Sequence, residues 1–211
     1  MKILALEFSS ARRSAAVLDG SGGAHEISAG SDAVRGLVMV EQALEASRLG
    51  RAEIECLVVG LGPGSYTGIR GAVALAQGWE LGRGVRILGI SSADAIAHEA
   101  RAAGILGTVA VVIDAQRGEF YTAVYEVSSA GCKEMEPLRI VSREAVLQRE
   151  AAGARLVGPE IERWFQSGAV IFPRAETLGR LAAGRTDFVA GENLVPIYLR
   201  ETTFVKAAPP G

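Results

Sequence analysis

The sequence predicts an α/β protein whose two lobes share one order of elements, β-β-β-α-β-α-β-α. Two observations support this fold class. Short apolar runs bounded by glycine, typical of strands, alternate with longer segments of helical periodicity. The order of these segments then repeats from Thr108 on, without obvious sequence identity between the halves. A length of 211 residues fits one large domain or two small ones, so we expect lobes at residues 1–104 and 105–211.

The first half opens with three short apolar runs, the last two separated by glycines, and these runs predict an antiparallel meander. A fourth run, Ile54–Gly60, lacks polar alternation and is expected to be buried on both faces. Helical periodicity marks three further segments. The expected strands are Ile3–Phe8, Ser14–Asp19, Ala24–Ser28, Ile54–Gly60 and Val85–Ile90, and the expected helices are Ala33–Arg48, Ile69–Leu81 and a segment from Ser91 or Ser92 to about Ala103.

The second half repeats this order, and its third strand contains Pro137, which predicts an edge position. The expected strands are Val109–Ile113, Phe120–Val127, Lys133–Ile140, Arg155–Val157 and Ala169–Phe172. Helices are expected at Ser142–Ala151, Pro159–Ser167 and Ala175–Ala183. The stretch from Gly184 to Gly211 is less regular.

Composition excludes several classes of protein. A net charge of −2 argues against a strongly basic nucleic-acid binder. Two isolated cysteines, Cys56 and Cys132, form neither a disulfide framework nor a zinc site. The apolar runs are shorter than the roughly 20 residues of a membrane helix, and no signal peptide is apparent. We therefore expect a soluble cytoplasmic protein without a membrane association.

The segment Gly62-Pro63-Gly64-Ser65-Tyr66-Thr67-Gly68 lies where a strand gives way to a helix. Glycine permits close backbone approach, and free amides at a helix N-terminus attract anions, so a phosphate cradle is one interpretation. A rigid turn that only aims the helix is the other. The P-loop, the dinucleotide-binding G-x-G-x-x-G motif and the hydrolase G-x-S-x-G elbow all fail to match. The residues considered for an anion contact are Gly62, Gly64, Ser65, Tyr66, Thr67, Gly68 and Arg70.

The helix after this turn is rich in small residues, which are favourable only where another helix packs very close. That neighbour is either the core of this chain or a second chain. The preceding helix has an apolar stripe broad enough for two neighbours, and Trp79 is a candidate anchor. The candidate interface residues are Val34, Leu37, Val38, Glu41, Gly71, Ala72, Ala74, Leu75, Gly78 and Trp79.

Four segments, in order along nearly the whole chain, resemble the TsaB (YeaZ) family. The most specific runs from Gly62 to Arg70 and continues as Ala74-x-Ala76-x-Gly78. The others are Gly89-Ile90-Ser91-Ser92, Ile113-Asp114-Ala115-Gln116-Arg117-Gly118-Glu119-Phe120-Tyr121 and Pro196-Ile197-Tyr198-Leu199-Arg200. The resemblance implies the ASKHA fold, the duplicated architecture of actin, hexokinase and Hsp70.

The resemblance also implies a role. In this family TsaB supports its paralogue TsaD, which carries the metal and transfers threonylcarbamoyl to the N6 of an adenosine next to the anticodon, in tRNAs reading codons that begin with adenine. A small ATPase, TsaE, completes the complex. This chain would be a non-catalytic scaffold that meets tRNA indirectly and forms a homodimer through the same surface when TsaD is absent.

The chain departs from the family at two places. It has Glu7-Phe8-Ser9-Ser10 where the family usually has Asp, and Gly30-Ser31 where it often has His-Ser. These changes weaken the case for a nucleotide site within this subunit, so ATP or ADP is expected only at the complex interface. Glu7, Ser9 and Asp114 remain candidate cleft residues, with a purely local turn role as the alternative for Asp114.

The residues offer no combination of nucleophile, base and orienting group. His25 and His98 cannot form a His-x-x-x-His metal pair, and no metal site or intrinsic cofactor is expected. The runner-up interpretation is a stand-alone ASKHA nucleotide-binding enzyme, either an ATPase or a kinase-like protein. A third is a protease that acts on its paralogue through Ser65.

Overall fold

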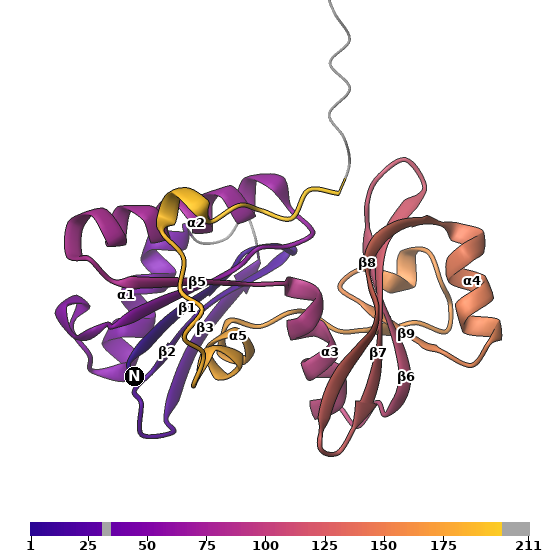
Figure 1. The fold of residues 1–211 in the computed structure, drawn as a ribbon, viewed down its shortest axis with the longest axis horizontal. Helices are drawn as coiled ribbons and strands as arrows, with labels where there is room; N and C mark the ends of the chain where they lie inside the picture. Colours follow the sequence, from indigo (N-terminus) through magenta and orange to yellow (C-terminus); the bar gives the residue numbers. More distant parts are fainter. Residues whose placement is uncertain (31–34, 200–211) are drawn as a thin grey trace, which may run out of the picture.

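The computed structural model describes residues 1–30 and 35–199, and it contains two five-stranded sheets side by side (Figure 1). In the first sheet the strand order is β3-β2-β1-β4-β5. The strands β1, β2 and β3 form the predicted antiparallel meander, whereas β4 and β5 run parallel to β1. The bounds are β1 Ile3–Glu7, β2 Arg12–Leu18, β3 Ala24–Gly30, β4 Cys56–Gly60 and β5 Arg86–Ile90.

The second sheet repeats this plan in the order β8-β7-β6-β9-β10. Its first three strands are again antiparallel, and its last two again run parallel to the central strand. The bounds are β6 Gly107–Asp114, β7 Glu119–Ser128, β8 Gly131–Ser142, β9 Arg155–Gly158 and β10 Ala169–Val170. The repeat confirms the predicted duplicated topology, and β8 with Pro137 is an edge strand as predicted.

Helices cover both faces of each sheet because successive strand side chains point to opposite faces. On the first sheet, Leu4 and Leu6 pack against α1 and α2, whereas Ile3 and Ala5 pack against α5. On the second sheet, α3 covers one face and α4 the other. The helix bounds are α1 Gly36–Ser47, α2 Tyr66–Arg83, α3 Ser92–Ala102, α4 Arg143–Ala151 and α5 Ala175–Ala182, with short 3₁₀ turns at Arg51–Glu53, Ile161–Arg163 and Gly191–Asn193.

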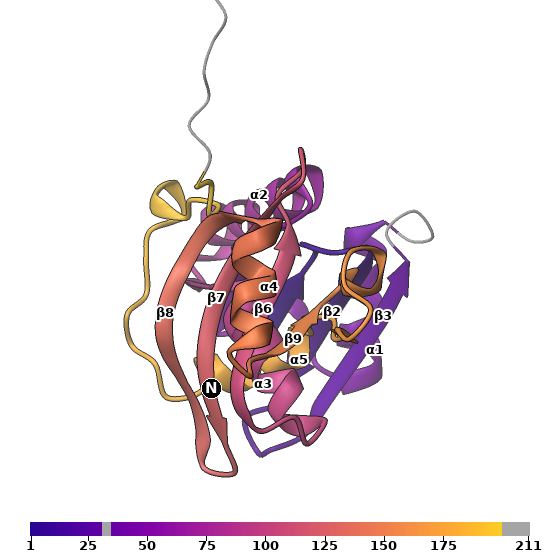
Figure 2. The same ribbon diagram turned by 90° about the vertical axis from the view of Figure 1, so that its right-hand side faces the viewer.

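Two helices cross between the halves of the chain. Helix α3 follows β5 in sequence but packs on the second sheet, and α5 follows β10 but packs on the first. Both lie between the sheets in Figure 1, which also shows the chain after α5 running along the first lobe toward α2. In Figure 2 the same segment, in yellow, ends near α2. The division into 1–104 and 105–211 stays a prediction, and α3 and α5 each pack across it.

Several strand ends differ from the predicted ones by two residues, and three predicted helices differ in ways that have an identifiable cause. Helix α1 begins at Gly36, not Ala33, because Arg35 is extended. Helix α2 begins three residues earlier than predicted because Ser65 caps it. The predicted helix Pro159–Ser167 contains only the 3₁₀ turn Ile161–Arg163, because Glu160 and Trp164 on either side of it, with φ angles of −130° and −120°, lie outside the helical region.

Candidate functional site

The glycine-rich segment is a tight turn that starts α2, buried at Gly62 and Pro63 and exposed from Gly64 to Thr67. Gly62 and Gly64 have φ angles of 86° and 148°, which side chains disfavour. A Cβ at Gly64 would also collide with the carbonyl oxygen of Ser9. Ser65 then caps α2, because its hydroxyl accepts the Gly68 amide at 3.3 Å. Only glycine therefore fits where the turn passes beneath the β1–β2 connection.

Hydrogen bonds hold this turn to two other elements. The Ser65 amide donates to the Ser9 carbonyl at 2.6 Å. The Gly62 amide donates to the Ser92 hydroxyl at 3.1 Å, and the Ser92 amide donates to the Gly62 carbonyl at 2.8 Å. The first residue of α3 thus fixes the position where α2 begins.

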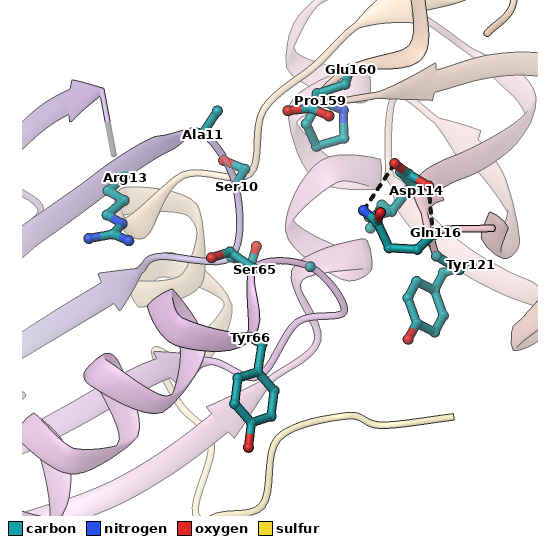
Figure 3. Close-up of a pocket in the computed structure, with 14 residues that line it drawn as sticks. Ser10, Ala11, Arg13, Ser65, Tyr66, Asp114, Gln116, Tyr121, Pro159 and Glu160 are labelled. Atoms are coloured by element: carbon teal, nitrogen blue, oxygen red, sulfur yellow. Dashed lines mark hydrogen bonds between the residues drawn. The ribbon is translucent and has the colours of Figure 1, made fainter. Parts of the chain in front are cut away.

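A cleft of about 550 Å³ opens between the two lobes beside this turn (Figure 3). One wall is the β1–β2 connection and the start of α2, and the other is the β6–β7 turn with the end of β9. Its lining residues are Ser9, Ser10, Ala11, Arg13, Gly64, Ser65, Tyr66, Ile113, Asp114, Ala115, Gln116, Tyr121, Pro159 and Glu160. The lining is rich in hydroxyl groups and carries both signs of charge.

The structure brings two of the three predicted cleft residues together and corrects the third. Ser9 and Asp114 line the cleft from opposite lobes. Asp114 also accepts hydrogen bonds from the backbone and side chain of Gln116, at 2.7 and 3.3 Å, so it has a local turn role as well. Glu7 does not line the cleft, because the end of β1 directs its carboxyl into the interior.

Glu7 is fully buried beneath the turn. Its carboxyl accepts the Ser9 amide at 2.7 Å and the Ser92 hydroxyl at 2.7 Å. Burial raises the pKa of Glu7 above its usual range, because a charged carboxylate loses its hydration there, and the two hydrogen bonds oppose this shift. The side chain is therefore a buried link between elements.

An aromatic cluster at the mouth of the cleft was not predicted from the sequence. The Tyr66 ring lies 5.5 Å from that of Tyr198, between centroids. The Arg70 guanidinium lies 5.1 Å from the Tyr66 centroid and donates to its hydroxyl at 2.7 Å. The i, i+4 spacing of Tyr66 and Arg70 was a usable signal, but nothing in the sequence paired Tyr198 with them.

The remaining turn residues divide between surface and interior. Gly64, Ser65 and Tyr66 line the cleft. Thr67 and Arg70 are exposed on α2 outside the lining, whereas Gly62 and Gly68 are buried. Of the residues predicted to contact an anion, the buried Gly62 and Gly68 are therefore inaccessible, and the others remain accessible.

The predicted partner face is exposed along α2. Gly71, Ala74 and Gly78 lie on its outer side. Apart from adjacent residues and the backbone of α2 itself, no atom of the described chain lies within 4 Å of a Cβ placed at Gly71 or Gly78. The small residues therefore do not accommodate a helix of the described part of this chain. On α1, Leu37 and Val38 are 48% and 39% exposed, and Glu41 is exposed in an ion pair with Arg51.

Three predicted interface residues are oriented differently. Ala72 is completely buried in the core of the first lobe, so its assignment to the interface was wrong. Leu75 and Trp79 are half-buried and pack against the same core, which leaves only part of each side chain accessible. Val34 lies outside the described residues.

A C-terminal strap, residues 189–199, runs beside α2. Gln77 and Glu80 bond the backbone of Gly191 at distances from 2.9 to 3.1 Å. The Ile197 amide donates to the Leu61 carbonyl at 2.9 Å, and Leu194 is buried in the core of the first lobe. The strap thus forms one border of the exposed face of α2, as α1 forms the other.

The histidines and cysteines lie away from the cleft. His25 is exposed on β3, and His98 is half-buried on α3, where burial and then Arg101 lower its pKa. Burial raises the pKa of the Cys56 thiol to about 11, so this cysteine is an inert core residue. Within residues 1–30 and 35–199, no group of three or more His, Cys, Asp or Glu side chains is placed to hold a metal ion.

The fold and the sequence together define the class of protein. Residues 20–195 match the family model described as "TsaD: tRNA N6-adenosine threonylcarbamoyltransferase". The chain has a TM-score of 0.80 against YeaZ from Pseudomonas aeruginosa, at 27% sequence identity over 94% of this chain and 99% of that one. With the repeated sheet topology, this confirms a duplicated ASKHA-type fold.

Two further comparisons narrow the class. The chain is 31% identical to the "tRNA threonylcarbamoyladenosine biosynthesis protein TsaB" of Escherichia coli (strain K12), over 99% of each chain. It also has a TM-score of 0.80, at 26% identity over 94% of this chain and 99% of the other, against a Pseudomonas aeruginosa protein described as having similarity to peptidase YEAZ. The chain belongs to the TsaB (YeaZ) family.

Proposed function

We propose that this protein acts in the biosynthesis of threonylcarbamoyladenosine on tRNA, as a non-catalytic subunit that supports TsaD. The observation that carries the proposal is the likeness to Escherichia coli TsaB along 99% of both chains. The reaction would be the transfer of threonylcarbamoyl to the N6 of an adenosine next to the anticodon, with the transfer chemistry on TsaD.

The contents of the cleft support a non-catalytic role. Neither of the two histidines lines it, and the Ser65 hydroxyl is engaged in capping α2. Glu7, which ends the central strand of the first lobe, is withdrawn into the interior. A hydroxyl nucleophile needs a base within hydrogen-bond reach, and these positions do not supply one at Ser65.

The exposed face of α2, with the adjoining side of α1, is the proposed site for TsaD. Gly71, Ala74 and Gly78 permit close approach of a partner helix, and Leu37 and Val38 add exposed apolar surface. The same face would form the homodimer when TsaD is absent, so the two assemblies would exclude each other. TsaE would join the TsaD-bound form.

The other functional expectations follow from this assignment. A net charge of −2 favours indirect contact with tRNA through the complex. We expect no intrinsic cofactor, and any ATP or ADP would bind only at the boundary with TsaD. Among the described residues, no helix is long and apolar enough to cross a membrane, and we place the complex in the cytoplasm with its tRNA substrate.

The interface is tested by charge insertion. Gly71→Glu or Ala74→Arg puts a charged side chain on the outer face of α2, where Gly71 has open space beside it and Ala74 is exposed. We expect TsaD binding to weaken by about 100-fold or more, because the charge would be buried without a partner. Leu147→Arg, at an exposed position of α4 in the second lobe, is the matched control and should bind as the original protein does.

Reconstitution tests the role itself. Purified TsaD, TsaE, the threonylcarbamoyl-adenylate donor and tRNA are assayed with this subunit present or omitted. Modification should depend on this subunit and should be lost with Ala74→Arg. Full modification without the subunit would reject the proposal.

The interlobe cleft is the observation that favours an alternative function, a stand-alone nucleotide-binding enzyme. Calorimetry with ATP and Mg²⁺ on the isolated subunit distinguishes this enzyme from the scaffold. Micromolar binding with turnover would reject the scaffold role.

A third candidate function is a peptidase, because one similar structure is described by its similarity to peptidase YEAZ. Cleavage of TsaD on mixing with this subunit, abolished by Ser65→Ala, would establish that activity. We expect TsaD to stay intact with both the original subunit and Ser65→Ala.

A further inference from the structure

The buried carboxyl of Glu7 connects three elements that have separate roles. It lies at the end of β1 and is completely inaccessible to solvent. Gly60, at the end of β4, leaves the space that the carboxyl occupies, since a Cβ there would collide with it. Neither the cleft nor the partner face uses this group directly.

One oxygen of Glu7 holds the β1–β2 connection. Its Oε1 accepts the Ser9 amide at 2.7 Å, and the Ser9 carbonyl in turn accepts the Ser65 amide, which precedes α2. The carboxyl therefore fixes the residue against which the start of α2 rests.

The other oxygen reaches α3. Glu7 Oε2 accepts the Ser92 hydroxyl at 2.7 Å. Ser92 exchanges two hydrogen bonds with Gly62, at 3.1 and 2.8 Å. Since α3 packs on the second sheet, this second route joins the turn before α2 to the second lobe.

We propose that Glu7 is a positioning residue that couples the exposed face of α2 to α3, and through α3 to the second lobe. A shift of α3 against the first sheet changes the hydrogen bonds of Ser92 to Gly62 and Glu7. Gly62 is part of the turn before α2, and Glu7 holds the loop that contacts this turn, so the shift changes the direction in which α2 starts. The coupling to partner binding rests on the proposed function, because it requires that the α2 face binds TsaD.

The chemistry of the site selects the test variants. Glu7→Gln keeps the side-chain length, an acceptor for the Ser9 amide and a polar partner for Ser92. Glu7→Met keeps approximate length and volume but leaves both partners unpaired in the interior. Thr122→Val is the matched control, since it removes another buried hydroxyl, on β7, that has no hydrogen-bond partner within the described chain.

Affinity for TsaD, measured by calorimetry on the full chain, is the first test. Glu7→Met breaks two buried hydrogen bonds and should weaken binding about tenfold, since only part of their free energy acts on the position of α2. Glu7→Gln and Thr122→Val should stay within about twofold. Ser92→Ala breaks the same route from its other end. Ser92→Ala also removes the acceptor of the Gly62 amide, so if the route is shared, the double variant Glu7→Met/Ser92→Ala should weaken binding by less than the product of the two single effects.

Hydrogen exchange on the isolated subunit is the second test and needs no partner. Glu7→Met should speed exchange at the amides of Ser9, Gly62 and Ser92, and in the first turn of α2, while β6 amides keep their protection. Unchanged exchange at these amides would overturn the coupling, whatever TsaD does. Faster exchange with unchanged affinity would overturn its link to the partner face. If the original protein fails to bind TsaD, the proposed function fails, and exchange alone still decides whether Glu7 couples α2 to α3.

Discussion

Two acidic side chains end the central strands of the two sheets, and burial gives them different roles. Asp114 ends β6 at the cleft and accepts bonds from Gln116 within its own turn. Glu7 ends β1 in the interior and accepts bonds from a neighbouring loop and from α3. The sequence predicted both as cleft residues because a strand end carries no sign of the direction in which its last side chain points.

The burial of Glu7 predicts a pH dependence of stability. Its pKa is raised above the usual value of 4.5 in the folded protein. Between pH 4.5 and the folded-state pKa, the folded protein therefore keeps a proton that the unfolded chain has released. The contribution of Glu7 to the free energy of unfolding should be fully present below pH 4.5 and should be lost as pH rises through the folded-state pKa.

Urea denaturation across a pH series measures this effect. Glu7→Gln cannot titrate, so the difference in unfolding free energy between the original protein and Glu7→Gln isolates the Glu7 contribution. Parallel pH profiles for the two proteins would contradict the raised pKa. A difference that grows in the opposite direction would show that the ionised form is the one that the fold prefers.

At the scale of elements, α2 has two borders of different origin. The border formed by α1 agrees with the sequence-based assignment of both helices to one candidate interface, since both bury an apolar stripe on the same face of the first sheet. The border formed by the strap was not predicted, because its contacts join Gln77, Glu80 and Tyr66 to a distant segment without regular periodicity. Periodic patterns predict which residues of an element are buried, but irregular segments give no such signal.

The strap should be an integral part of the first lobe. Leu194 is 4% exposed in the core, and its neighbour Val195 is 62% exposed. Leu194→Ala should lower the free energy of unfolding by about 2–5 kcal/mol, whereas Val195→Ala, the matched control, should change it by less than about 0.5 kcal/mol. Denaturant titration measures both, and equal small effects would mean that the strap detaches without cost.

At the scale of the whole molecule, an ionic cluster lies where the chain crosses from the second lobe to α5. Arg174 pairs with Glu26 of β3 and lies 4.0 Å from Glu99 of α3. The Glu26 side chain is only 8% exposed. One guanidinium therefore joins the first sheet, α3 and the approach to α5.

Removal of this guanidinium should destabilise the protein more than removal of a surface one. Arg174→Met leaves the nearly buried Glu26 without its cation, and we expect a loss of about 1–3 kcal/mol in unfolding free energy. Arg180→Met breaks an exposed i, i+4 pair with Glu176 and should cost less than about 1 kcal/mol. Chemical denaturation of both variants measures the two changes in unfolding free energy. A smaller loss for Arg174→Met than for Arg180→Met would show that the ionic cluster does not stabilise the segment leading from the second lobe to α5.

The duplicated order of elements was predictable from the sequence because apolar runs and glycine turns are local signals. The exchange of α3 and α5 between the sheets was not, because an amphipathic stripe shows that a helix face is buried but not which sheet buries it. The burial of Ala72 beside the exposed Gly71 and Ala74 shows the same limit within one helix. Assigning such residues requires the rotation of α2 on its sheet, which Ser65 and the turn determine.

The crossing helices have a consequence for synthesis on the ribosome. When residues 1–104 have emerged, the first sheet lacks α5, and the face that carries Ile3 and Ala5 is uncovered. Helix α3 has emerged by then, but the sheet it packs on has not. The nascent chain therefore exposes apolar surface from the time the first sheet has emerged until α5 follows it, and this interval favours aggregation.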